Sequence, residues 1–394
     1  MSDAVSGEAS AGRGGTALHD DPVVDVVLAE ALDTGAVPGA VAVIDDAEAA
    51  FVAPLFALGA QDVRVFSDFG VGSLRGPEAS RYASLLDERE AAVSKGVVRE
   101  ETPDGSLFTD VTLVVGRLPK SLAELEDLAQ CIHRQAAPDA RVILGAREKH
   151  LTRSMNEVLG KYFADVRGTR GMRKSRAIVA TGRIPDAVTE ANAFPRTAQL
   201  EELDLVVAAR GGAFAGTTLD LGTRVLLQSI PGDRPGTVSL ADVVSDGEPS
   251  IHTAVDLGCG TGLLAAVLAR SFADANVIAT DASWWACASA EQTAEANGFA
   301  ERIEVLRANA GAGIEPGSVD LVLCNPPFHD GRQVDPGLAN ELFRGAARML
   351  RSGGLLVTVF NSHLKHRQHL ENIVGPTQQL NRTEKFTVTV SERR

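Results

Sequence analysis

The sequence predicts an α/β protein with two tandem domains, each built on a mostly parallel sheet with helices on both faces. Three observations support this fold class. The chain has 394 residues, which exceeds one typical domain and is enough for two hydrophobic cores. Short β-branched runs alternate with helical stretches in both halves. In each half one of these runs ends on a turn with proline, GRLPKS at 116–121 and CNPPFH at 324–329, which indicates a duplicated domain.

The first half begins with a tail of small and polar residues at 1–22, which we expect to be disordered. Its strand candidates are VAVIDD at 41–46, VRVFSD at 63–68, VTLVVG at 111–116 and RVILGA at 141–146. Residues 121–135 predict an amphipathic helix, because Ser121 is a good N-cap and Leu122, Leu125, Leu128 and Ile132 recur at three- and four-residue spacing. We expect this domain to cover residues 23–186.

The second half follows a linker at 187–202 and repeats the alternation more strongly. It contains six strand candidates, which are TAVDLG, NVIATD, IEVLRA, VDLVLCN, GGLLVTVF and KFTVTVSE. We expect a domain over 203–394 with a seven-stranded, mostly parallel sheet.

Composition argues against several classes of protein. No window approaches the roughly 18 uncharged apolar residues of a membrane span. The first twenty residues lack the basic start and apolar run of a signal peptide, so we expect a cytoplasmic protein that contacts no membrane. The formal net charge of −14 argues against unspecific adhesion to nucleic acid. Four cysteines lie far apart without metal-ligand spacing, so buried free thiols and no metal site are expected: Cys131, Cys259, Cys287 and Cys324.

A glycine-rich loop in the second half is the first candidate binding site. VDLGCGTG at 255–262 follows a strand and precedes a helical stretch, the context in which backbone N–H groups reach a ligand. A dinucleotide fingerprint needs glycine or alanine at position 263, where this chain has Leu263. The residues match D-x-G-x-G-x-G instead, in which Asp256 engages an ammonium group and the glycines Gly258, Gly260 and Gly262 admit a small amino-acid moiety.

A carboxylate beyond the loop completes this prediction. Asp281 ends the next strand, where a carboxylate can hold both ribose hydroxyls of a nucleoside. The predicted ligand is a nucleoside that carries an amino acid and no phosphate. The alternative is a glycine turn that only connects strand to helix.

These features resemble the class I S-adenosylmethionine-dependent methyltransferases, and the resemblance covers the second half. It implies a Rossmann-like fold and S-adenosylmethionine as cofactor, with Cys259 and Ala282 beside the residues already named. Asn309 and Ala310 follow the third strand, where such enzymes contact the adenine; a turn-forming Asn is the alternative. Trp284 and Trp285 either border the adenine or pack a helix, and we favour packing.

The stretch LVLCNPPFHD at 321–330 is the second candidate site, where a strand ends on a rigid turn. Prolines 326 and 327 hold Asn325 and the Pro326 carbonyl stiffly at the end of the sheet where ligands bind. Those two acceptors can take both N–H bonds of an exocyclic amine, and Phe328 can stack on the base. We therefore predict catalytic roles for Asn325, Pro326, Pro327 and Phe328, with Asn325 also contacting the cofactor. A proline turn with a core Phe is the alternative, and His329 contacts either substrate or backbone.

A narrower resemblance comes from NPPFH together with GGAFAGTTLDLGTR at 211–224 and NSHLKHRQHLENIVG at 361–375. These features are similar to the bacterial ribosomal RNA guanine-N2 methyltransferases, of the large-subunit or the small-subunit type. The resemblance implies a degenerate amino-terminal methyltransferase-like domain, an active carboxyl-terminal one, and Phe214 over the cofactor or substrate pocket. Gly216, Thr217 and Thr218 stand where the family has a Ser-Arg-Asp-like run.

The first domain lacks the features of a cofactor site. VAVIDD continues without D-x-G-x-G, and its proline turn, 118–121, has no Asn, so we expect it to bind no cofactor. Residues 134–183 carry twelve Lys and Arg against four Asp and Glu. Within RGTRGMRKSR at 167–176, the side chains of Arg170, Arg173 and Lys174 can lie on RNA phosphates; a solvated loop is the alternative.

The sequence therefore predicts a monomeric methyltransferase whose partner is ribosomal RNA or a ribosomal subunit. The same chemistry leaves adenine N6 or a protein glutamine open as the methyl acceptor. A noncatalytic RNA-binding or assembly factor with this fold is the alternative from another class.

Overall fold

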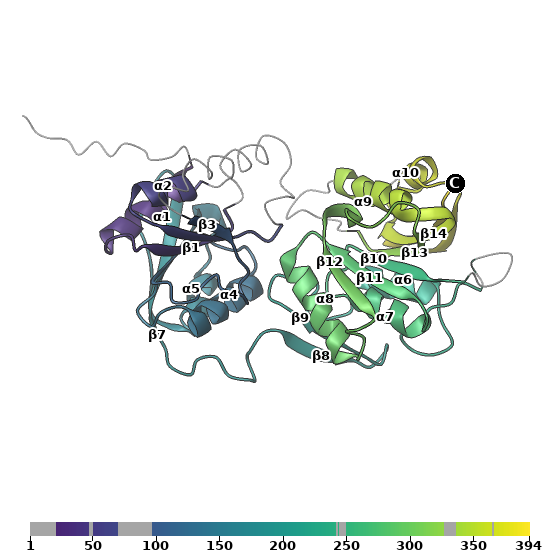
Figure 1. Ribbon diagram of the computed structural model, residues 1–394, viewed down its shortest axis with the longest axis horizontal. Coiled ribbons are helices and arrows are strands. Elements are labelled where there is room, and N and C mark those ends of the chain that lie inside the picture. Colours follow the sequence, from purple (N-terminus) through teal and green to yellow (C-terminus); the bar gives the residue numbers. More distant parts are fainter. Residues whose placement is uncertain are drawn as a thin grey trace, which may run out of the picture.

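The computed structural model describes residues 21–46, 50–69, 97–241, 243, 250–326, 336–364 and 366–394. Figure 1 shows two α/β halves side by side, purple to blue for the first and green to yellow for the second. Each half contains a seven-stranded sheet, in the order β3-β2-β1-β4-β5-β7-β6 and β12-β11-β10-β13-β14-β16-β15. The predicted fold class is confirmed, and the two strand orders are the same.

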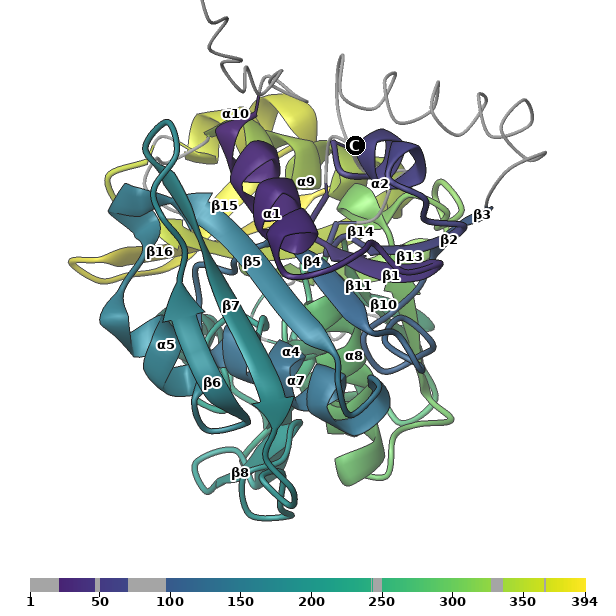
Figure 2. The ribbon, with the colours of Figure 1, turned by 90° about the vertical axis from the view of Figure 1, so that its left-hand side faces the viewer.

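The first sheet is parallel except for the antiparallel strand β7 and its partner β6. Its strands are β1 (Ala40–Ile44), β2 (Asp62–Phe66), β3 (Val97–Glu100), β4 (Leu113–Arg117), β5 (Arg141–Arg147), β6 (Phe163–Gly168) and β7 (Ser175–Arg183). One face carries α1 (Pro22–Asp33) and α2 (Val52–Ala57), and α1 lies across β5 and β7 in Figure 2. The other face carries α4 (Leu122–Gln135) and α5 (Arg153–Leu159).

The helix predicted at 121–135 is confirmed as α4. The Ser121 hydroxyl accepts the Glu124 N–H and so caps the first turn. Leu125, Leu128 and Ile132 are buried against the sheet, as their spacing predicts.

The second sheet has the same plan, with β14 and β16 antiparallel and β15 at the edge. Its strands are β10 (Thr253–Leu257), β11 (Asn276–Asp281), β12 (Ile303–Arg307), β13 (Val319–Cys324), β14 (Leu350–Asn361), β15 (Thr377–Arg382) and β16 (Phe386–Glu392). Six of these strands match predicted runs. The sequence TQQLNR of β15 is polar and mostly exposed, so it lacks the apolar signal of a strand.

Helices cover both faces of the second sheet. One face carries α6 (Leu221–Ser229), α7 (Leu263–Ser271) and α8 (Trp284–Ala296). The other carries α9 (Pro336–Met349) and α10 (His366–Ile373). A separate antiparallel pair, β8 (Arg196–Leu200) and β9 (Leu205–Ala209), joins the halves, so the predicted linker contains β8. Ser289 and Thr293 of α8 and its C-cap Asn297 accept backbone N–H groups from β9 and Arg210 at 2.9–3.0 Å, which fixes this strand on the helix.

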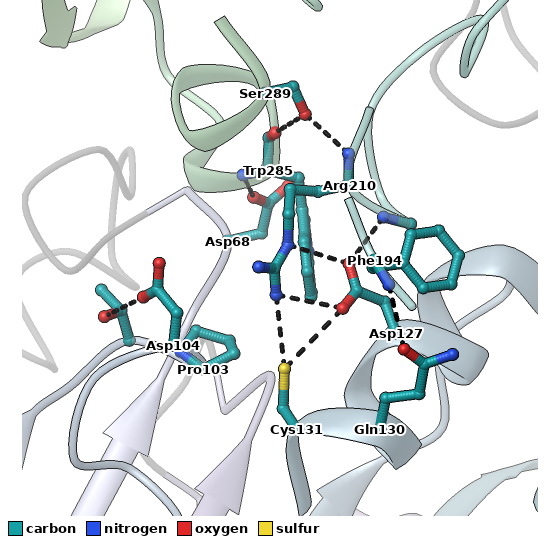
Figure 3. Close-up of polar contacts among 12 residues, drawn as sticks. Asp68, Pro103, Asp104, Asp127, Gln130, Cys131, Phe194, Arg210, Trp285 and Ser289 are labelled. Atoms are coloured by element: carbon teal, nitrogen blue, oxygen red, sulfur yellow. Dashed lines mark hydrogen bonds and ion pairs between the residues drawn. The ribbon is translucent and has the colours of Figure 1, made fainter. Parts of the chain in front are cut away.

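The two halves meet through a buried polar cluster around Arg210 (Figure 3). The Arg210 guanidinium donates to both carboxylate oxygens of Asp127 at 3.0 Å, and the Gly211 N–H donates to the same carboxylate. Trp284 and Trp285 pack edge-on against Phe66 of the first half. The prediction that these tryptophans pack a helix is confirmed, and the helix packs on the other domain.

Asp68, at the end of β2, reaches across the same interface to the start of α8. Its carboxylate accepts the Ser283 hydroxyl at 2.8 Å and the Trp285 N–H at 3.2 Å, while its backbone carbonyl accepts the Trp284 N–H at 2.9 Å. A residue of the first half therefore caps a helix of the second.

Candidate active site

A pocket opens at the carboxyl ends of β10 and β13. Three segments of the second half line it. The loop after β9 and the start of α6 contribute Phe214, Ala215, Thr218, Asp220 and Thr223; the glycine loop and the start of α7 contribute Asp256, Gly258, Cys259, Gly260, Thr261, Leu263 and Leu264; and Asn325 follows β13. The sequence places these segments far apart. The parallel register of β10 with β13 brings the glycine loop and Asn325 together, and hydrogen bonds from Asn325 to Asp220 and Thr223 join the start of α6 to them.

Positive φ angles shape the glycine loop. Gly258, Gly260 and Gly262 have φ of 75°, 53° and 73°, a region that disfavours residues with a Cβ. A Cβ on Gly258 or Gly260 would meet nothing within 4 Å, so these two glycines face open space. A Cβ on Gly262 would lie 2.7 Å from the Cα of Ala290, so this glycine allows α7 to approach α8 and does not line the pocket.

Asp256 brings a buried carboxylate to the pocket wall. Its Oδ2 accepts the Ala265 N–H at 2.9 Å, and its Oδ1 has no hydrogen-bond partner among the described residues. Burial raises the pKa of Asp256 from 3.8 to about 7, and the neighbouring Asp281 charge adds to the shift. A buried oxygen without a hydrogen bond is costly, and the described residues supply no donor for this one.

Asp281 supports the loop from the next strand. Its carboxylate accepts the Gly260 N–H at 3.1 Å and the Ser283 N–H at 2.9 Å. Burial raises the pKa of this carboxyl group. Ala282 follows directly, and neither residue is among those that line the pocket.

The Asn325 side chain is held from the opposite wall. Its amide nitrogen donates to Asp220 Oδ2 at 3.0 Å and to Thr223 Oγ1 at 2.9 Å. Its amide oxygen is buried without a partner in the described part of the chain. Asp220 is the N-cap of α6, where the same Oδ2 accepts the Gly222 and Thr223 N–H groups. Sequence analysis missed Asp220 and Thr223; the N-cap pattern before LGTRVLLQ was the available signal.

Family models match nearly the whole chain. The RLMG N-terminal domain matches residues 25–183, and the Methyltransferase small domain matches residues 204–390. The ribosomal RNA large subunit methyltransferase G of Pseudomonas syringae pv. tomato is 35% identical over 324 residues, or 78% of this chain and 82% of that protein. The chain belongs to this family. The corresponding Pseudomonas fluorescens protein is 34% identical over 277 residues, 70% of this chain and 69% of the relative.

A solved structure shares the two-domain fold of this methyltransferase G family member. The T. thermophilus 16S rRNA N2 G1207 methyltransferase in complex with AdoMet and guanosine has a TM-score of 0.67 and 21% identity, over 95% of this chain and 92% of that chain. The resemblance to ribosomal RNA guanine-N2 methyltransferases in the sequence is thereby confirmed at the level of family and fold.

Some of the other site residues predicted from the sequence line the pocket and others do not. Phe214 is 69% exposed and lines it, whereas Pro326 is buried after β13. Pro327, Phe328 and His329 lie outside the described residues. Asn309 donates to Glu341 Oε1 at 2.9 Å. Neither Asn309 nor the following Ala310, with φ of 47°, lines the pocket.

The predicted basic residues lie at the β6–β7 hairpin of the first half. Arg170 and Lys174 are exposed, and Arg173 pairs with Asp25 of α1 at 2.8 Å. Arg173 and Lys174 have φ of 48° and 60° in the tight turn closed by Met172 and Ser175, which directs two basic residues to its tip.

Two negative observations concern the described residues alone. No three His, Cys, Asp or Glu side chains there form a group that could hold a metal ion. No described helix has the length and hydropathy needed to cross a membrane. All four cysteines are buried free thiols, as predicted.

Proposed function

We propose that the protein transfers the methyl group of S-adenosylmethionine to the exocyclic N2 of a guanine in large-subunit ribosomal RNA. The observation that carries this proposal is Asn325 at the wall of the glycine-loop pocket, whose amide oxygen is buried and has no partner in the part of the chain that the structure describes. The names of the curated relatives support ribosomal RNA as substrate, and the guanosine in the complex of the T. thermophilus enzyme supports guanine.

The residues of the pocket fit the cofactor. Open space beside Gly258 and Gly260 leaves room for the amino-acid part of the ligand against the loop. The Asp256 Oδ1 is available to an ammonium group, and Asp281 lies one strand away for the ribose hydroxyls. The methyl donor is S-adenosylmethionine, whose sulfonium supplies an electrophilic methyl group.

The acceptor amine needs help from the protein, because its lone pair is delocalised into the guanine ring. Asn325 Oδ1 and the Pro326 carbonyl accept its two N–H bonds and favour the pyramidal nitrogen that attacks the methyl carbon. This interaction strengthens as positive charge develops on nitrogen, so it lowers the barrier and not only the energy of the bound state. One proton leaves the nitrogen to solvent after transfer, and no strong general base is required.

Aromatic side chains hold the base beside these acceptors. Phe214 is exposed at the pocket and presents its ring to an incoming base. Phe328 and His329 follow the Asn-Pro-Pro turn, and we assign them to stacking and to substrate contact. The guanine must leave its helix or loop to reach this depth, and stacking offsets part of that cost.

We assign catalysis to residues 203–394 and RNA contact to residues 23–186. Arg170, Arg173 and Lys174 of the β6–β7 hairpin are the proposed phosphate contacts, because a tight turn presents Arg173 and Lys174 at its tip and Arg170 is exposed just before that turn. The protein acts in this proposal as a cytoplasmic monomer.

The test is methyl transfer from labelled S-adenosylmethionine to ribosomal subunits that lack the modification, followed by nucleoside analysis. Label in N2-methylguanosine of the large-subunit RNA is the expected result. Label in adenosine or in protein would retain the mechanism and overturn the substrate. No label together with no cofactor binding would indicate a noncatalytic RNA-binding factor.

A further inference from the structure

We propose that Asp220 and Thr223 are positioning residues that fix the orientation of the Asn325 amide and so create the acceptor used in methyl transfer. This inference rests on the proposed function, because it explains how the Asn325 amide is oriented for methyl transfer. Both residues line the pocket with Asn325. Asp220 is the N-cap of α6, 105 positions earlier in the chain, and Thr223 lies in the first turn of α6, 102 positions earlier.

The orienting effect follows from the chemistry of the partners. A carboxylate accepts hydrogen bonds and donates none, so the side of Asn325 that faces Asp220 must be its NH₂ group. Thr223 Oγ1 takes the second N–H at 2.9 Å. Both amide protons are then occupied, and the Asn325 oxygen is left as the acceptor without a partner among the described residues.

The carboxylate of Asp220 is itself fixed by the helix that it caps. Its Oδ2 accepts the Gly222 N–H at 2.8 Å and the Thr223 N–H at 3.2 Å, so the positive end of α6 holds it in place. Gly222 makes the close approach possible, because a Cβ there would lie 3.1 Å from Asn325 Oδ1 and 3.4 Å from Nδ2. One carboxylate oxygen therefore joins the start of α6 to the end of β13.

The first half of the molecule contains the same clasp, defined as an N-cap aspartate that binds a side chain at the carboxyl end of the fourth strand. Asp21 caps α1 by accepting the Val23 N–H, and its other oxygen binds the Arg117 guanidinium at 2.6 Å. Arg117 corresponds to Asn325, because Ile44 pairs with Gly116 as Leu257 pairs with Cys324. The contact belongs to the repeated fold and is not an accident of one loop.

The two clasps differ in what they hold. A guanidinium in the first half has donors on every side, so the aspartate gains a charge pair and selects no orientation. An amide has a donor end and an acceptor end, so the same aspartate decides which end is left for a ligand. The clasp therefore affects catalysis only in the second half, where it orients Asn325.

The test uses Asp220→Ser, because a serine caps a helix well and is too short to reach Asn325. We expect kcat on ribosomal subunits to fall about 10- to 100-fold, the usual effect of misplacing a reacting group or its support. The dissociation constant of S-adenosylmethionine, measured by calorimetry, is expected to change less than about twofold, since Asn325 is displaced and the loop is intact. Asp220→Asn retains an oxygen at the same position and should keep more activity than Asp220→Ser.

Four further variants separate orientation from folding. Asp21→Ser breaks the corresponding clasp in the first half and is the matched control, with kcat expected within about twofold of wild type. Thr223→Val removes the second acceptor, and Thr223→Ser should retain more activity than Thr223→Val. In the Asn325→Ala background, Asp220→Ser should cause no further loss in single-turnover rate, because the amide it orients is gone.

A second readout needs no substrate. In protein labelled with ¹⁵N-asparagine, the Asn325 NH₂ signal, identified by its loss in Asn325→Ala, should exchange slowly in wild type and faster in Asp220→Ser. Wild-type transfer with an unchanged kcat in Asp220→Ser would overturn the inference. If wild type labels no RNA, the proposed function fails, and equal NH₂ exchange in both proteins would then overturn the clasp independently.

Discussion

The two halves of the molecule share one strand order and differ in a few side chains at the ends of the strands. The backbone corresponds closely where the pocket forms: Asp45 has φ of 54° and donates its N–H to the Phe66 carbonyl at 2.9 Å, while Gly258 has φ of 75° and donates to Thr280 at 2.8 Å. Both loops turn in the left-handed region after the first strand of the sheet. The first half therefore retains the turn of a cofactor loop in its backbone.

The side chains at corresponding positions are different. The register places Val43 at the position of Asp256, and Ser67 at the position of Asp281. Arg117 takes the place of Asn325 and binds Asp21. In the first half the end of the fourth strand thus carries a charge pair, whereas Asp256 and Asn325 in the second half each have an acceptor oxygen without a partner among the described residues. The two halves therefore share the arrangement of strands and differ in the side chains at the positions that line the pocket in the second half.

The largest expected effect concerns the contact that joins the halves. Arg210→Met should lower the free energy of unfolding by about 3–5 kcal/mol, because it leaves the Asp127 carboxylate buried without its partner. Urea unfolding measures this loss. The double variant Asp127→Leu with Arg210→Met should recover much of the stability, since no uncompensated charge remains. A single variant that loses less than about 1 kcal/mol would mean that this ion pair contributes little to joining the halves.

The next prediction compares substitutions at the ends of the two fourth strands, at Asn325 and at Arg117. Asn325→Ala should reduce kcat by about 10²–10³-fold while leaving S-adenosylmethionine binding nearly intact, because it removes a transition-state acceptor. Arg117→Ala, at the corresponding position, should leave kcat nearly unchanged. Rates come from labelled methyl transfer and affinities from calorimetry. Comparable losses in kcat from both variants would show that the first half takes part in catalysis.

The ionisation of Asp256 in the glycine loop should make both the stability of the protein and its affinity for the cofactor depend on pH. Asp256 has a raised pKa of about 7 in the folded protein, so the folded state binds more protons than the unfolded state between about pH 4 and 7. Its contribution to stability falls as pH rises through that window. Cofactor binding needs the ionised carboxylate, so affinity should weaken by about tenfold per pH unit well below 7. Asp256→Asn should bind more weakly at pH 8 and lose this dependence, which titration calorimetry at several pH values measures.

The smallest expected effect concerns the shared left-handed turn. Gly258→Ala should cost about 1–2 kcal/mol of stability and also weaken cofactor binding, since the new Cβ enters the space beside the loop. Asp45→Gly should change stability by less than about 1 kcal/mol, because relief of the left-handed strain and the greater entropy of glycine in the unfolded chain oppose each other. Thermal denaturation with and without S-adenosylmethionine distinguishes the two. Equal loss of cofactor binding in both variants would contradict the assignment of the site to the second half.

The sequence was most informative where a signal is contained within one short stretch. The glycine loop and the Asn-Pro-Pro turn each fix their own backbone, so their place at the ends of β10 and β13 could be predicted from neighbours in the chain. The helix α4 followed from apolar spacing and its Ser121 cap. The strand β15 could not be predicted, because an exposed edge strand needs no apolar pattern.

The sequence by itself determined the fold class, the α/β alternation and two of the three stretches that line the pocket, the glycine loop and the turn at Asn325. Only the tertiary structure decided that Asp220 orients Asn325 from 105 residues away, and that Asp68 caps a helix 215 positions later. It also decided that Gly262 serves helix packing while Gly258 and Gly260 face the pocket. The physical reason is range: dihedral preferences and periodicity act between neighbours, whereas these contacts depend on how two sheets and their helices pack.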